Sequence, residues 1–175
     1  VPTSTMEVFY TNTWCSYVIE KDVTEQMIED GCVIISQHTD TIGPAIACEE
    51  ASETGKKVYF VGWGHSMSEV APGTSLVTSR ICWEPYVLSA VEAVMTDKKI
   101  ETVVSAKIWG NDVSAGFEKG WVEMMDLSLT IAAPGTQDAI DEAIDQFKRG
   151  NNDMVFGTGY IENDHSSYPL FDDII

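Results

Sequence analysis

The stretch CVIISQHTDTIGPAIACEEASETGKKVYFVGW, residues 32–63, decides the fold. It begins with a continuous apolar run at residues 32–36 and ends with a second at residues 57–63. Both runs are typical of strands buried in a parallel sheet. The segment between them has Pro44 in its first turn and Gly55 just past its end, which are the positions that these residues prefer around a helix. A strand, a helix and a second strand predict a right-handed parallel β-α-β unit.

Upstream of this unit, the sequence predicts another strand and an amphipathic helix. The strand is expected at residues 6–10 and the helix at residues 16–30. The apolar positions of this helix recur every fourth residue, as core-facing positions do: Ile19, Val23 and Met27. Ser16 is placed to cap the start of the helix, and Gly31 is placed to end it.

Downstream, residues 75–80 are expected to form a further strand, after which the pattern is less regular. We expect helices at residues 85–96 and 136–149, strands at 103–110 and 120–129, and a loop-like tail at 157–175. The fold class predicted is α/β, an open and mostly parallel sheet with helices on both faces. We divide the chain into a ligand-binding α/β lobe, 1–80, and a hinge and return segment, 81–175.

Charge and composition exclude several classes of function. Among 175 residues there are 28 Asp and Glu against 10 Lys and Arg, a net charge of −18 that is spread along the chain. Such a chain repels phosphate backbones and anionic lipids, so we expect no nucleic-acid partner. No stretch approaches the roughly 18 apolar residues of a membrane span.

Four cysteines occur without a C-x-x-C pair, so we expect neither a disulfide framework nor a zinc site. Cys48, on an alanine-rich helix, is expected to be a small core residue.

Aromatic and polar side chains gather in the loops that follow the predicted strands. Ligands of open parallel sheets bind beyond the carboxyl ends of the strands, so these loops are the place to look for a site. The candidate ligand-binding residues are Asn12, Trp14, His38, Asp40, Trp63, Ser66, Arg80 and Trp83. Indole rings stack on flat heterocycles or on sugars, while amides and carboxylates hydrogen-bond at the edge. Core or hinge packing of the tryptophans remains the alternative.

One short segment raises the possibility of an enzyme. GHSMS at residues 64–68 is close to G-x-S-x-G, the turn that presents the nucleophile of α/β-hydrolases. The alternative is therefore a small serine hydrolase that uses Ser66 and His165. It is disfavoured because Pro72 arrives too soon for the helix that must follow the nucleophile.

We expect neither a cofactor nor a metal ion. Gly62-x-Gly64 lacks the third glycine of a dinucleotide fingerprint, and His38-x-Asp40 lacks the spacing of a metal motif.

Five segments carry a resemblance to a known family: TNTW at residues 11–14, QHTD at 37–40, VYFVGWGHSMSEVAPG at 58–73, TSRICWEPY at 78–86 and, more weakly, IWGNDVSAGF at 108–117. In these segments the chain resembles the basic membrane protein (Bmp) family of solute-binding lipoproteins, the nucleoside receptors of ABC transporters. The QHTD tract at its spacing is the most specific part.

The resemblance implies one lobe, with part of the return segment, of a type I periplasmic-binding-protein fold, in which two lobes close on a ligand. Members bind purine nucleosides with the base between aromatic rings. By position, Trp14 would stack on the base, while Asn12 and Asp40 would line the cleft. Asp40 could instead cap the helix that follows it. Arg80, Trp83 and Trp63 come second.

The segment at residues 64–66 departs from the family. Some relatives carry an acidic residue there that can bind the ribose, whereas this chain has no acidic residue before Glu69. Some members also use a lysine near the hinge, and this chain has no counterpart unless Arg80 serves. The ligand is therefore left open between a purine nucleoside, a free base and another small molecule.

The resemblance also implies the partners and the location. It implies a binding component, not an enzyme, that works with an ABC transporter permease and with a further, N-terminal lobe. It places the protein in the periplasm or on the extracellular face of the membrane, lipid-anchored through a segment outside this chain. The match begins in mid-lobe, so we expect a fragment or one piece of a split protein. A ligand-sensing regulatory domain of the same fold is the other alternative.

Overall fold

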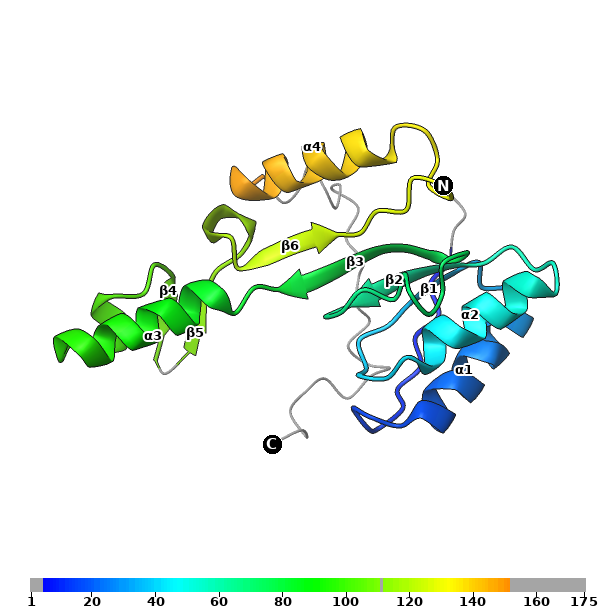
Figure 1. Ribbon diagram of the computed structural model, residues 1–175, viewed down its shortest axis with the longest axis horizontal. Coiled ribbons are helices and arrows are strands. Elements are labelled where there is room, and N and C mark those ends of the chain that lie inside the picture. The colour runs from blue at the N-terminus through cyan, green and yellow to red at the C-terminus, as the bar shows by residue number, and fades with distance from the viewer. Residues whose placement is uncertain (1–4, 111, 152–175) are drawn as a thin grey trace.

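The computed structural model of the chain describes residues 5–110 and 112–151 (Figure 1). Its first part alternates helices and strands: α1 (Tyr17–Glu29), β1 (Ile34–Ser36), α2 (Gly43–Glu53), β2 (Tyr59–Trp63) and β3 (Ser75–Ile81). The second part contains α3 (Glu84–Thr96), η1 (Ile100–Thr102), β4 (Lys107–Trp109), β5 (Asp112–Ser114), η2 (Phe117–Lys119), β6 (Val122–Met125) and α4 (Thr136–Lys148). The predicted tail, 157–175, and His165 lie outside the described residues.

Four strands form the main sheet, in the order β1-β2-β3-β6. β1 and β2 are parallel, and so are β2 and β3, whereas β6 returns antiparallel to β3. β4 and β5 form a separate antiparallel pair. In Figure 1, α1 and α2 lie together on one side of the sheet, and α4 lies on the other side, beyond β6. A mostly parallel sheet flanked by helices confirms the predicted fold class.

The core lies between α2 and the sheet. Phe60 of β2 and Cys48 of α2 are both 0% exposed, and Ile35 of β1 packs with them. Cys48 is therefore the small core residue that the sequence predicts. Among the described residues, no helix is both long and apolar enough to cross a membrane.

The buried face of α1 differs from the prediction by one residue. Glu20, Thr24 and Ile28 are buried, while the predicted stripe starts at Ile19, which is 43% exposed. The Ser16 side chain makes no cap hydrogen bond, and its backbone N–H instead donates to Glu20. The hydrogen bonds of Glu20 to Thr39 and Thr41 thus help to set the rotation of the helix, whereas Thr24 bonds within α1 to the Glu20 carbonyl. Gly31, at a φ of +103°, follows the helix as predicted.

Three predicted strands are also corrected. Residues 6–10 form no strand, because β1 is the edge strand of the sheet as described, and no described residue pairs with it on that side. The strand expected at 103–110 shrinks to β4, and that at 120–129 shrinks to β6. β6 ends where its pairing with β3 ends, at Met125.

Candidate functional site

An aromatic cluster lies where β1 and β2 end. His38, in the loop after β1, sits between two indoles: its ring centroid is 5.8 Å from that of Trp14 and 4.7 Å from that of Trp63. The rings are inclined at 61° and 50° respectively. The cluster forms because β1 and β2 are parallel, with Ser36 opposite Val61, so that both chains leave the sheet at the same edge. Three of the predicted site residues are thus brought together.

The cluster is open to solvent on one side. Trp14 keeps 55% of its surface exposed, His38 is exposed, and Trp63 is half-buried at the end of its strand. Exposed indole surface of this size is a platform on which a flat, apolar ring can stack. The cluster is therefore suited to binding a heterocycle.

The TNTW segment is a turn held by its own side chains. Asn12 has a φ of 55°, a left-handed conformation that asparagine tolerates better than most residues. Its amide Nδ2 donates to the Tyr10 carbonyl over 3.5 Å, and the Thr11 hydroxyl donates to the Thr13 carbonyl over 2.7 Å. Asn12 lies in this turn, two residues before Trp14, the outer ring of the cluster.

The QHTD segment is tied to the TNTW turn. The Asp40 N–H donates to the Trp14 carbonyl over 2.8 Å, which joins the two motifs directly. The Gln37 side-chain amide donates to the carbonyls of Thr39 (2.6 Å) and Thr41 (2.7 Å) and closes the loop on itself. The two motifs that carry the family resemblance therefore form one connected structure.

Asp40 does not cap the helix that follows it. α2 begins at Gly43 with Ile42 as its N-cap residue, and no side chain makes the cap hydrogen bond. The Gly43 N–H reaches the Thr41 hydroxyl instead, over 3.2 Å. The carboxylate of Asp40 is exposed at the loop surface, where a ligand can meet it.

Glu20 is a site residue that the sequence did not reveal. It is 2% exposed, and its carboxylate accepts hydrogen bonds from Ser16, Thr39 and Thr41. Burial by itself raises the pKa of Glu20, but these hydrogen bonds outweigh burial and leave the pKa below its ordinary value of 4.5. The sequence places a glutamate of a surface helix on the solvent-facing side. Only Thr39 and Thr41, two positions apart in the loop after β1, could have indicated this contact.

Arg80 lies on β3, one residue beyond Ser79, the register partner of Trp63, and Trp83 lies past the end of that strand. The Arg80 guanidinium forms an ion pair with Glu123, its register partner on β6. Trp83 is 64% exposed at the start of α3, and no ring contact within the described residues joins it to the cluster. Their roles as ligand contacts remain predictions.

Ser66 lies in the wrong context for a nucleophile. Its hydroxyl hydrogen-bonds to that of Ser68, 2.8 Å away. Turns follow it up to β3, whereas the hydrolase fold requires a helix directly after the nucleophile. Ser66 is half-buried in the loop that follows Trp63, and its role as a hydroxyl facing a ligand remains a prediction.

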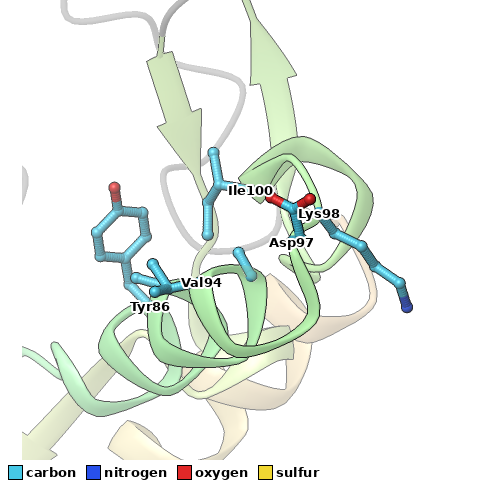
Figure 2. A pocket seen from close by; sticks show the side chains of 7 residues that line it. Tyr86, Val94, Asp97, Lys98 and Ile100 are labelled. Carbon is cyan, nitrogen blue, oxygen red and sulfur yellow. The ribbon is translucent and has the colours of Figure 1, made fainter.

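A separate groove lies beside α3, with a cavity volume of about 460 Å³. Figure 2 shows Tyr86, Val94 and Ile100 around it, with the ammonium end of Lys98 pointing away. It includes none of the cluster residues, and Val94 on its rim is 83% exposed. It is a shallow surface feature and not the predicted site.

An α/β lobe with an aromatic platform at the carboxyl ends of its parallel strands fits the class of solute-binding proteins, and a family model assigns the chain to that class. The chain belongs to one family of that class, the Bmp family of PnrA-like substrate-binding proteins of ABC transporters, whose model matches residues 2–131. Proteins of this family bind solutes and are not enzymes, which contradicts the serine hydrolase alternative.

The relatives agree with this assignment. A purine-binding protein of Brucella abortus is 30% identical over 123 residues, which are 70% of this chain and 31% of that protein. A solute-binding protein of an ABC transporter from Aeropyrum pernix superposes with a TM-score of 0.59 at 14% identity, over 82% of this chain and 45% of that one. A transcriptional activator of the comK gene from Bacillus halodurans gives 0.58 at 15% identity, over 81% and 46%. The chain thus spans less than half the length of these relatives, and the two solved structures support the fold alone.

Proposed function

We propose that this chain provides one wall of a ligand cleft that binds a purine nucleoside or a related base for an ABC transporter. The observation that carries the proposal is the cluster of Trp14, His38 and Trp63 at the carboxyl ends of β1 and β2. A purine is flat, and it gains most from stacking on an exposed indole. The purine-binding name of the Brucella abortus relative favours the same ligand class.

Each predicted residue has a role in this proposal. The Trp14 ring stacks on the base. His38 packs against Trp14, and Trp63 packs against His38, so that both support the Trp14 ring. Asn12 of the TNTW segment and Asp40 of the QHTD segment bind polar atoms at the edge of the ligand, and Ser66 adds a hydroxyl. Arg80 and Trp83 contribute from the hinge, between a lobe at 1–80 and a return segment at 81–175.

The remaining partners lie outside this chain. A second lobe supplies the opposite wall of the cleft, and the closed form docks on the transporter permease. Solute-binding proteins of ABC transporters are typically extracytoplasmic, and we propose the same location here, with a lipid anchor in the full-length protein.

Calorimetric titration tests the proposal. Adenosine, guanosine, inosine and their free bases are titrated into the 175-residue chain and into the longest natural form of the protein. We expect micromolar or tighter binding of at least one of them by the long form, and weaker binding of the same compound by this chain. Absence of binding by the long form would contradict the ligand class. Binding of free bases but not of nucleosides would place the specificity in the ring alone.

A further inference from the structure

Glu20 gathers four hydrogen-bond donors around a buried carboxylate. The Ser16 N–H donates to Oε1 over 2.8 Å. Oε2 accepts from the Thr39 hydroxyl (2.8 Å), the Thr41 hydroxyl (2.7 Å) and the Thr41 N–H (3.2 Å). Three of the four donors therefore belong to the QHTD loop or to the residue directly after it. A group that α1 contributes thus holds a loop that follows β1.

The same loop carries His38 into the aromatic cluster. Thr39 is anchored to Glu20, and Gln37 donates to the carbonyls of Thr39 and Thr41 from within the loop. His38 lies between these anchored residues, and its ring has one indole on either side. The position of the imidazole therefore depends on the contacts of its neighbours.

We propose that Glu20 is a positioning residue that holds His38 between Trp14 and Trp63 and so presents the aromatic cluster to a ligand. The identity of the ligand rests on the proposed function, but the arrangement of the cluster does not.

A carboxylate is required at this position because of two backbone donors. The Ser16 N–H points at one oxygen and the Thr41 N–H at the other, and backbone donors cannot rotate away. A glutamine has one acceptor oxygen and one NH₂ group, so it would place a donor against one of the two N–H groups. The threonine hydroxyls can reorient, whereas the backbone groups cannot. Glu20→Gln therefore releases either the start of α1 or the QHTD loop.

Glu49 provides a matched control. It is also a glutamate on a helix, and its carboxylate accepts from the Gly73 N–H (3.0 and 3.1 Å) and from the Thr74 hydroxyl (2.9 Å). Thr74 directly precedes β3, so Glu49 acts at the amino end of the parallel strands, the edge opposite the cluster. Glu49→Gln thus makes the same chemical change at a half-buried carboxylate that has one backbone donor, without touching the QHTD loop.

Proton NMR of the histidine rings reads the position of His38 without any ligand. The chain has three histidines, and Gln variants of His65 and His165 assign the His38 signals by elimination. In the unchanged chain, the two indoles shift the His38 ring protons away from the positions of the exposed His65. We expect Glu20→Gln to move them toward those of His65 and Glu49→Gln to leave them in place.

Unchanged His38 signals in folded Glu20→Gln and Glu20→Ala variants would overturn the inference, because alanine leaves the QHTD loop without this acceptor whichever way a glutamine side chain would turn. If Glu20→Gln does not fold, Thr39→Val decides instead, because it removes one donor of the same contact. A partial move of the His38 signals supports the inference, and no move overturns it.

Binding adds an independent measurement. For the purine that binds the unchanged chain best, Glu20→Gln should raise the dissociation constant about tenfold, while Glu49→Gln should change it less than about twofold. If no purine binds the longest natural form of the protein, the proposed function fails, and the NMR experiment still decides the role of Glu20.

Discussion

At the scale of the residue, Trp14 is the part of the cluster that a ligand can cover, since 55% of its surface is exposed. Base stacking on an aromatic side chain contributes roughly 1–3 kcal/mol, which is about a fivefold to 150-fold change in affinity. We expect Trp14→Ala to weaken binding by that amount, measured by calorimetry with the purine that binds best. Phe9→Ala removes another exposed ring, outside the cluster, and should leave affinity unchanged. Equal effects of both substitutions would take Trp14 out of the site.

The lowered pKa of Glu20 predicts a dependence of stability on pH. A carboxylate whose pKa is lower in the folded state stabilises the fold above its ordinary value of 4.5, and the effect is lost as pH falls through the folded pKa. The free energy of unfolding of the unchanged chain should exceed that of Glu20→Gln by a constant amount between about pH 6 and 8. Below about pH 4.5 the difference should shrink. Urea denaturation over this range measures it, and a gap that widens in acid would show that the carboxylate is not held ionised.

The sequence predicts the residues of the cluster better than it predicts their support. His38 and Trp63 are found because loops after neighbouring parallel strands meet at one edge of the sheet. Trp14 follows a predicted strand that does not form, and the hydrogen bond from the Asp40 N–H to its carbonyl ties it to the QHTD loop. Glu20 is missed because its partners, Thr39 and Thr41, are far away in the sequence, and nothing local distinguishes it from a solvated glutamate. Contacts of this kind depend on how two elements dock, which no local pattern records.

At the scale of the element, the contact between α1 and α2 depends on Gly43. A Cβ at this position would lie 2.7 Å from the Tyr17 carbonyl oxygen and 3.2 Å from the Lys21 nitrogen, both of which are backbone atoms. The clash cannot be relieved by a side-chain rotation, so Gly43→Ala must push the helices apart. We expect a loss of about 1–3 kcal/mol in the free energy of unfolding, measured by urea denaturation.

Gly116→Ala is the control for this substitution. There a Cβ would meet only the end of the exposed Glu118 side chain, at 2.9 Å, and that side chain can move. The control should change stability by less than about 0.5 kcal/mol. A Gly43→Ala variant as stable as the control would mean that the two helices tolerate a wider separation.

The sequence predicts an element correctly where residues such as proline and glycine mark its ends. The prediction fails where a segment becomes a strand only if another strand pairs with it. α2 is predicted well because Pro44 and Gly55 mark its ends. The strand at residues 6–10 fails because an apolar alternation becomes a strand only beside another strand, and the edge of β1 offers none in the structure. The rotation of α1 fails by one position because polar contacts, not apolar ones, define its buried face.

At the scale of the whole molecule, the sequence predicts the fold class and one wall of the cleft, but not the rest of the cleft. The chain covers 31% of its Brucella abortus relative, and the opposite wall of the proposed cleft is assigned to a second lobe. In the structure α3 leaves Leu88, Val94 and Met95 largely exposed, although helices of this composition are usually covered.

The net charge of −18 makes a prediction for the molecule as a whole. Acidic side chains repel one another more in the folded chain than in the extended one, so they lower stability at neutral pH. Salt screens this repulsion, because the Debye length falls from about 30 Å at 0.01 M to about 3 Å at 1 M. Salt also weakens attractive pairs such as Lys21–Glu50 (2.7 Å), which is partly buried at Lys21, and the exposed pair Arg149–Asp145 (3.7 Å), but ion pairs at the surface contribute little.

Repulsion should therefore dominate the response to salt. We expect the urea midpoint at pH 7 to rise as NaCl increases from about 0.02 to 0.5 M. The same series near pH 4.2, the isoelectric point, is the control, because a chain with no net charge has little repulsion to screen. There the midpoint should stay level or fall. A fall at pH 7 would show that ion pairs outweigh the excess of acidic residues, and the charge would then act on solubility and on the choice of partners but not on the stability of the fold.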